Sequence, residues 1–220
     1  MKNNVVIVDD HEIVLIGISA LINSSNTCTM VGAYHTVQEV AEHVHDHTKP
    51  PIDVVLLDLH LSDNSCPHDN INYLRELDLA VLIFSAYESP YLTRQALTAG
   101  VDGIIEKSTS SENIIQAINA ACSNPHNPVT SCTSWLATNC VPLSPRQREV
   151  LELYALGEPA KRVASLTGLS VETVNDYLSR IRTKYAQAGR PTFSKVDLVL
   201  RALEDGLIPG PRDVRVRTLR

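Results

Sequence analysis

Four short apolar runs, each leading into polar residues, constrain the fold of this chain more than any other feature of its sequence. The runs occupy residues 5–8, 54–57, 81–84 and 104–105. Uninterrupted apolar runs of this length are typical of strands buried on both faces of a parallel sheet. The polar residues after the runs are Asp9 and Asp10, Asp58, Ser85, and Lys107. Because parallel α/β sheets build their sites at the carboxyl ends of strands, we expect these side chains to lie close together.

Helical patterns separate the apolar runs throughout residues 1–122. We expect strands at about 4–8, 29–33, 53–57, 81–84 and 103–106, and helices at about 12–23, 36–47, 69–77, 90–99 and 111–122. Five such β-then-α units predict a parallel sheet with helices on both faces. Right-handed crossovers favour a flavodoxin-like, doubly wound, five-stranded α/β fold.

The rest of the chain predicts a different fold. Residues 123–142 carry no charge and contain three prolines, which is the composition of a linker. Residues 143–208 predict a small all-α domain of four helices, at about 144–156, 159–167, 171–185 and 194–206, before a basic tail at 209–220. Ser144 and Gln147 form a capping-box pattern at the start of the first helix.

Two helices of this domain carry apolar patterns that predict a core. In the third helix, the residues that share one face are Val174, Leu178, Ile181 and Tyr185. In the fourth helix, the residues that we expect to be buried are Val196, Val199, Leu200 and Leu203.

Charge divides the chain in the same way. Residues 1–122 contain 5 Lys and Arg against 16 Asp and Glu, a net −11, whereas residues 143–220 contain 14 against 9, a net +5. An acidic half joined to a basic half indicates metal or phosphate chemistry in one and anion binding in the other. With five cysteines and no CxxC pair, no signal peptide and no apolar run of membrane-spanning length, we expect a cytoplasmic protein without a membrane segment.

The polar residues after the strands predict a magnesium and phosphoryl site. Mg²⁺ prefers oxygen ligands, and Asp10 and Asp58 offer two carboxylates, with Asp9 one water further out. A hydroxyl at Ser85 and the ammonium of Lys107 are suited to phosphoryl oxygens. A carboxylate that accepts a phosphoryl group acts as a switch.

Residues 1–122 resemble the receiver domain of two-component response regulators, through VVIVDDHEIVLIGISALI, VVLLDLHL, LIFSA and AGVDGIIEKS. The resemblance implies that Asp58 is the phosphoacceptor and that Asp10 and Asp58 bind Mg²⁺ directly. It also implies that the backbone carbonyl of His60 is a metal ligand, and that Ser85 and Lys107 contact the phosphoryl group. A sensor histidine kinase is the implied partner.

Two departures from the receiver pattern lie near this site. Leu61-Ser62-Asp63 stands where Met-Pro-Gly is usual, and Ile104 stands where an aromatic residue is common. They motivate an alternative, in which the receiver is controlled by a ligand or a protein partner without phosphorylation. A third interpretation is an enzyme, such as a phosphatase with an aspartyl nucleophile, although His60 stands where a second acid is frequent in such sites.

The second and third helices of the C-terminal part, joined by Gly168-Leu169-Ser170, predict a DNA-binding helix-turn-helix. A plain four-helix interaction domain is the alternative. Residues 143–208 resemble the NarL/FixJ/LuxR output domain, through LSPRQREVLELYALGEPAKRVASLTGLSVETVNDYLSRIRTKY. This resemblance implies a recognition helix at about 171–185, and a homodimer through the last helix.

The residues that we expect to contact double-stranded promoter DNA are Lys161, Thr173, Asn175, Asp176, Ser179, Arg180, Arg182 and Lys184. The family often has a basic residue where Asn175 and Ser179 stand, and Asp176 places a negative charge near the DNA. Two interpretations stay open. In one, Asn175 pairs with adenine and Asp176 accepts from cytosine N4, so that both set specificity. In the other, these residues only weaken the affinity for DNA.

Together these patterns predict a transcriptional response regulator, not an enzyme, that is switched by Mg²⁺-dependent phosphorylation. A separate pattern is the pair His43 and His47, which share a helix face at the spacing of a metal site. A solvated helix end is the competing interpretation.

Overall fold

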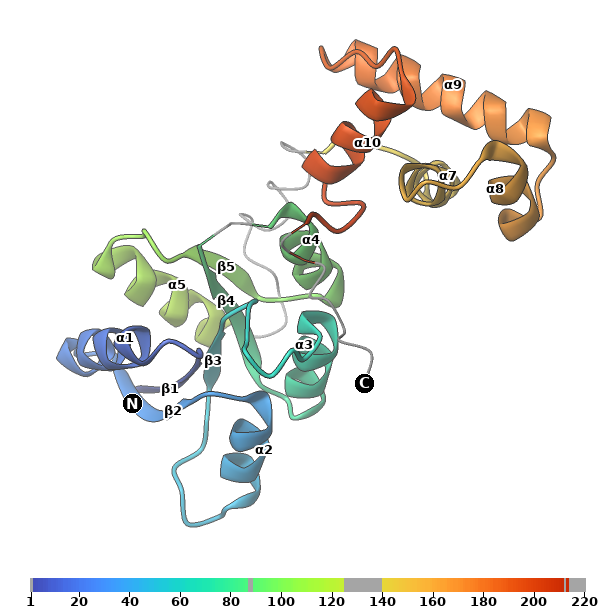
Figure 1. Ribbon diagram of the computed structural model, residues 1–220. Coiled ribbons are helices and arrows are strands. Elements are labelled where there is room, and N and C mark those ends of the chain that lie inside the picture. Colours follow the sequence, from blue (N-terminus) through green and yellow to red (C-terminus); the bar gives the residue numbers. More distant parts are fainter. Residues whose placement is uncertain (1, 87–88, 125–139, 212, 214–220) are drawn as a thin grey trace. The chain divides into compact units, whose positions relative to one another are not determined.

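The computed structural model describes residues 2–86, 89–124, 140–211 and 213 (Figure 1). Most of the expected linker, including Trp135-Leu136, and most of the basic tail lie outside the described residues. The described residues form two compact units, one built around a sheet and the other from helices. No helix among them is both long enough and apolar enough to cross a membrane.

The first unit contains one five-stranded sheet in which every pairing is parallel. Its strands are β1 (Asn3–Val8), β2 (Cys28–Tyr34), β3 (Val54–Leu57), β4 (Ala80–Ser85) and β5 (Gly103–Glu106). They lie in the order β2-β1-β3-β4-β5, with the switch point between β1 and β3. The expected doubly wound, flavodoxin-like fold is confirmed.

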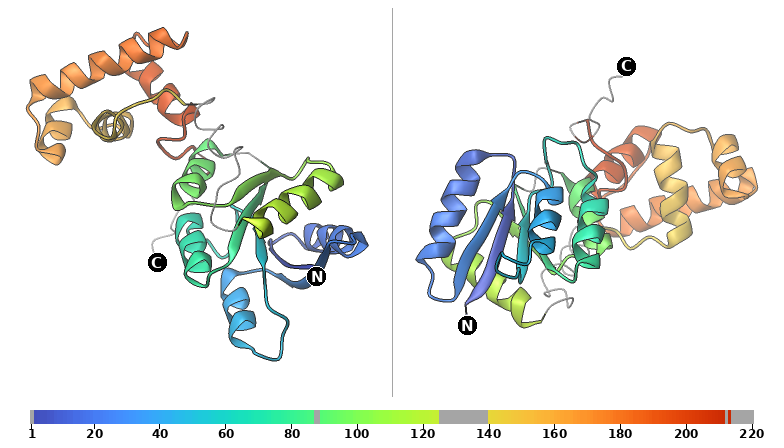
Figure 2. Two further views of the ribbon diagram at one scale, coloured as in Figure 1. Left: turned by 180° about the vertical axis from the view of Figure 1, so that it is seen from behind. Right: turned by 90° about the horizontal axis from the view of Figure 1, so that it is seen from below.

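Helices cover both faces of the sheet (Figure 2). Helices α1 (Glu12–Ser24) and α5 (Ser111–Ser123) lie on one face, and α2 (Val37–His45), α3 (Pro67–Glu76) and α4 (Pro90–Ala99) lie on the other. Alternate strand residues face α1 and α5, so that Val5, Ile7 and Leu56 pack against Ile18 and Ile118. Burial on both faces explains why the strands are continuous apolar runs.

In the second unit, residues 140–211 form four helices, as the sequence predicts. They are α7 (Pro145–Ala155), α8 (Ala160–Thr167), α9 (Val171–Gln187) and α10 (Lys195–Glu204). The expected capping box is present in α7, because the Ser144 side chain accepts from Gln147 N and the Gln147 side chain accepts from Ser144 N. The four core residues expected in α9 are all buried.

Half of the predicted core face of α10 is wrong. Val196 and Leu200 are 66% and 50% exposed, whereas Leu198 and Ala202 are fully buried. Val199 and Leu203 are half-buried against the core of this unit. Two apolar stripes run along this helix, and the stripe through Leu198 and Ala202 is the one turned inward.

Candidate functional site

The three carboxylates come together because β1 and β3 are neighbours in the sheet. Val8 is in register with Leu57, and the backbone N–H of Asp58 donates to the carbonyl of Val8 at 2.9 Å. The chain therefore leaves both strands at one edge, where Asp9, Asp10 and Asp58 follow. Ligand atoms of these residues and of His11 all lie within 4.8 Å of one another.

Lys107 joins two of these carboxylates. Its Nζ lies 2.7 Å from Asp9 Oδ2 and 3.0 Å from Asp58 Oδ2. The neighbouring strands β4 and β5 place it there, and its backbone N–H donates to the carbonyl of the buried Ser85 at 2.9 Å. The predicted convergence of Asp9, Asp10, Asp58 and Lys107 is thus observed. Ser85 takes part through its backbone carbonyl, and a role for its hydroxyl stays a prediction.

Burial and charge act against each other at this site. Burial raises the pKa of Asp58, and the nearby Asp9 adds to this, while Lys107 opposes both without cancelling them. Burial alone would lower the pKa of Lys107, but its bonds to Asp9 and Asp58 outweigh burial and hold that pKa above its usual value. The Lys107 ammonium therefore stays charged, whereas the site disfavours the charged form of the buried Asp58 carboxyl group.

His11 is a member of this cluster that the sequence did not assign. Its Nδ1 lies 3.0 Å from Asp9 Oδ1 and 2.8 Å from Asp10 Oδ1, and its side chain is 61% exposed. Its backbone N–H also donates to Asp9 Oδ1 at 2.9 Å. The position of His11 directly after the acidic pair was the only sequence signal for this contact.

The donor set fits a divalent cation. Asp9 Oδ2 and Asp10 Oδ1 are buried, and the described residues meet each of them through one side-chain nitrogen. Their partners are the charged or ring nitrogens of Lys107 and His11. Buried carboxylate oxygens that still have acceptor capacity are what Mg²⁺ uses. His60 is half-buried two residues beyond Asp58, and its role as a carbonyl ligand stays a prediction.

The loop that departs from the receiver pattern is held by its own contacts. Leu61 is buried, Ser65 N donates to Asp63 Oδ1 at 2.9 Å, and Asn70 Nδ2 donates to Ser65 Oγ at 2.7 Å. Asn64 adopts a left-handed φ of 59°, which suits Asn. A defined polar loop therefore leads from Asp58 to α3.

The other departure, Ile104, is half-buried on β5 and in register with Ile83 of β4. It packs as an ordinary strand residue.

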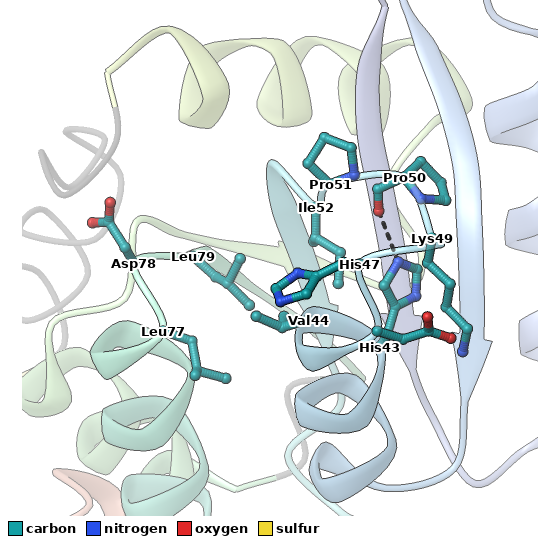
Figure 3. Close-up of a pocket in the computed structure, with 11 residues that line it drawn as sticks. His43, Val44, His47, Lys49, Pro50, Pro51, Ile52, Leu77, Asp78 and Leu79 are labelled. Carbon is teal, nitrogen blue, oxygen red and sulfur yellow. Dashed lines mark hydrogen bonds between the residues drawn. The ribbon is translucent and has the colours of Figure 1, made fainter.

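His43 and His47 do not form a metal site. His43 is buried, and its Nε2 lies 2.9 Å from the carbonyl of Pro50 (Figure 3). Its Nδ1 lies 2.6 Å from Tyr34 Oη, so both ring nitrogens are occupied. His47 lies at the edge of a hollow of about 370 Å³, which is also lined by Ile52, Leu77 and Leu79. This hollow lies before β3 and β4, at the amino end of the sheet.

The helix-turn-helix is formed by α8 and α9. Gly168 ends α8 with a left-handed φ of 70°, which glycine adopts without strain. Ser170 caps α9 by accepting from Thr173 N at 3.0 Å. Because Val174, Leu178 and Ile181 face the core, the opposite side of α9 faces solvent.

The expected DNA-contacting residues divide into two groups. Asn175, Asp176, Ser179 and Arg180 are exposed on α9, Arg182 is half-buried, and Lys161 is exposed on α8. Within the described part of the chain, the side chains of these six residues make no hydrogen bond or ion pair.

The side chains of two further residues that were expected to contact DNA, by contrast, make hydrogen bonds within the helical unit. Thr173 Oγ1 lies 2.8 Å from Ser170 Oγ. Lys184 Nζ donates to the carbonyl of Pro142 at 2.6 Å and to Gln147 Oε1 at 2.9 Å. Lys184 thus ties α9 to the start of α7.

Comparison with known proteins identifies the family. The sequence profile of the response regulator receiver domain matches residues 5–119, more than half of the chain. The chain belongs to the response regulator family. The profile of sigma-70 region 4 matches residues 143–184, over the helix-turn-helix.

Relatives of this response regulator share both parts. It is 25% identical over 203 residues to the transcriptional regulatory protein DesR of Bacillus subtilis, covering 92% of this chain and 98% of DesR. It is 28% identical over 192 residues to the response regulator protein VraR of Staphylococcus saprophyticus, covering 84% and 90%. RcsB from Salmonella enterica serovar Typhimurium, in a solved structure, shares the fold with a TM-score of 0.61 at 20% identity, over 94% of this chain and 100% of RcsB.

The molecule is therefore a two-component response regulator of the NarL/FixJ type with a DNA-binding helix-turn-helix. Proteins of this family are transcription factors and not enzymes, so the phosphatase interpretation falls away.

Proposed function

We propose that a sensor histidine kinase in the cytoplasm phosphorylates Asp58, and that this switches a homodimer of the regulator onto promoter DNA. The observation that supports this most is the bridge of Lys107 between Asp9 and Asp58. It gathers a nucleophilic carboxylate, an acidic pair and a fixed cation at one edge of the sheet. Phosphoryl transfer to a carboxylate needs these groups.

Each residue of the site has a defined task in the transfer. An oxygen of Asp58 forms a bond to phosphorus, while the bond from phosphorus to the kinase histidine breaks and the released imidazole takes up a proton. Asp10, Asp58 and the His60 carbonyl would hold Mg²⁺, with Asp9 behind them, and the cation would supply positive charge that offsets the phosphoryl oxygens. Lys107 moves its contact from Asp58 Oδ2 to a phosphoryl oxygen, and the Ser85 hydroxyl donates to another.

The output step is supported by the exposed polar face of α9 and by the relatives. RcsB has been solved bound to a promoter in the presence of the phosphomimetic BeF3⁻. In a helix-turn-helix the second helix enters the major groove, and that helix here is α9. The exposed apolar residues Val196 and Leu200 on α10 suit a contact between two copies, which would present two α9 helices to paired half-sites.

The test is the intact mass of the full chain after incubation with Mg²⁺ and a small phosphodonor. We expect a single phosphoryl adduct on the wild type and none on Asp58→Asn. Asp69→Asn is the matched control, because this exposed carboxylate on α3 lies outside the site and its loss should leave the adduct intact. Promoter binding is then measured with each protein before and after phosphorylation.

The second candidate, control by a ligand or a protein partner without phosphorylation, rests on Ile104 and the polar loop after Asp58. It predicts no adduct with a small phosphodonor or a histidine kinase, and DNA binding that is equal for the wild type and Asp58→Asn.

A further inference from the structure

The outward face of α9 has an acidic residue at its centre and arginines to either side at unequal angles. At about 100° per residue, Asp176 lies about 200° around the helix from the buried Val174, so it points away from the core. Arg180 lies about 40° to one side of Asp176, and the half-buried Arg182 lies about 120° to the other side. On a helix in the major groove, the flanks face the phosphate walls and the centre faces the base edges.

Asp176 has no structural task within the described part of the chain. It is exposed and makes no hydrogen bond or ion pair there, even though Arg180 stands one turn away. Glu172 is the residue one turn before it, and two like charges at this spacing destabilise a helix. Glu172 itself lies in the first turn of α9, where the helix dipole stabilises an acid. That explanation does not extend to Asp176, which lies in the second turn.

Building on the proposed function, we propose that Asp176 is a specificity-determining residue, which accepts a hydrogen bond from the N4 amino group of a cytosine in each half-site. An ionised carboxylate is an acceptor only, so it requires a base edge that offers a donor. Cytosine N4 offers this donor in the major groove with no acceptor beside it on the same base, whereas adenine has the acceptor N7 beside its N6 donor, and guanine presents only the acceptors N7 and O6.

The negative charge of Asp176 also lowers the affinity for other DNA sequences. Where no amino group meets the carboxylate, it stays desolvated among base-edge acceptors and within the field of the phosphates, and binding weakens. The arginines on the flanks of α9 supply affinity that does not depend on sequence, and Asp176 removes part of it at wrong sites.

The test is selection from a random duplex DNA library with the phosphorylated full chain. The wild type, Asp176→Asn and Asp176→Ala are compared, with Glu172→Gln as the matched control for loss of one acid on α9. We expect the wild type to require a C·G pair at one position of each half-site. Replacing that pair should weaken binding by roughly 5- to 150-fold.

The variants should change this one position in different ways. Asp176→Asn should move the preference from cytosine toward adenine, because an amide pairs with adenine N6 and N7. Asp176→Ala should lose the preference there and bind unrelated duplexes more tightly than the wild type does. Glu172→Gln should keep the cytosine.

The possible failures are distinct. If both Asp176 variants select the wild-type sequence at every position, the role of Asp176 is overturned while DNA binding stands. If the wild type enriches no sequence, with or without phosphorylation, the proposed function is overturned and this inference with it. Because Asp176 is exposed and its charge repels Glu172, unfolding midpoints equal to or slightly above that of the wild type are expected and serve as the check that the variants fold.

Discussion

At the scale of single residues, Lys107 keeps together two carboxylates that would otherwise repel each other in a buried place. Asp9 is fully buried and Asp58 is 5% exposed, and one ammonium serves both. Even so, burial outweighs this attraction at Asp58, whose pKa stays raised. In the resting protein, the ionised form of Asp58 is therefore unfavourable, and this carboxylate is the group that is proposed to react.

The raised pKa of Asp58 predicts that the stability of the protein depends on pH. A carboxyl group whose pKa is higher in the folded than in the unfolded protein lowers stability as the pH rises from about 3.9 through the raised value. Asn cannot ionise, so Asp58→Asn should be more stable than the wild type at pH 7. The difference should shrink as the pH falls and vanish when Asp58 is protonated in both states.

Denaturant unfolding of the two proteins at a series of pH values from 3 to 8 measures this difference. Asp69→Asn, which removes a first-turn acid of α3, should lose a small helix-dipole contribution and should not gain stability at pH 7. An Asp58→Asn variant that is less stable than the wild type at pH 7 would show that the bond to Lys107 outweighs burial, contrary to this prediction.

At the scale of secondary-structure elements, α10 is the helix with two apolar stripes. One stripe, through Leu198 and Ala202, is buried in the unit, and the other, through Val196 and Leu200, is exposed. The second stripe contributes little to folding of a single copy, and it is where the proposed contact between two copies is placed.

We expect Leu200→Lys to weaken the contact between two copies while leaving the folding of each copy nearly unchanged. The side chain is half-exposed, so unfolding free energy should change by no more than about 0.5 kcal/mol. Binding of the phosphorylated chain to paired half-sites should fall by about a hundredfold, because two linked recognition helices gain from effective concentration. Binding to a single half-site should change little.

Fluorescence anisotropy with one- and two-site duplexes measures both effects. The control is Leu156→Lys, which makes the same replacement at an exposed leucine of the α7 C-cap. Since lysine adds a positive charge, a loss of affinity cannot come from repulsion by DNA. Equal losses on both duplexes would argue against a dimer through α10.

The elements also show where sequence patterns suffice and where they fail. The strands and their polar ends could be predicted, because burial on both faces leaves continuous apolar runs such as Val54–Leu57. The inward stripe of α10 could not, because both stripes are apolar and only tertiary packing selects between them. The contacts of His11, His43 and Lys184 depend on neighbours distant in the chain or on side-chain rotation, which no local pattern specifies.

At the scale of the whole molecule, a chain with a net charge of −6 ends in a basic part. Residues 143–220 carry a net +5, of which the DNA-binding domain at 143–208 holds +2 and the tail at 209–220 holds +3. Within the domain, α8 and α9 present Lys161, Arg162, Arg180 and Arg182. DNA therefore meets a local positive field despite the overall negative charge.

This distribution predicts a strong effect of salt. If four cations in each copy contact phosphates, affinity for DNA should fall by about a hundredfold between 50 and 200 mM salt for each half-site. Replacing Arg180 by Ala should reduce the slope of log K against log salt by about one and weaken all sequences alike. A slope unchanged by this replacement would remove Arg180 from the phosphate contacts.

The bonds from Lys184 to Pro142 and Gln147 have a consequence for how such regulators diverge. A lysine near the end of the recognition helix is committed to holding that helix against α7. New promoter preferences can therefore arise by substitution in the first turns of α9 without loss of the fold, while change at position 184 is penalised. After gene duplication, descendants of this chain are expected to vary at 175, 176 and 179 and to keep the lysine.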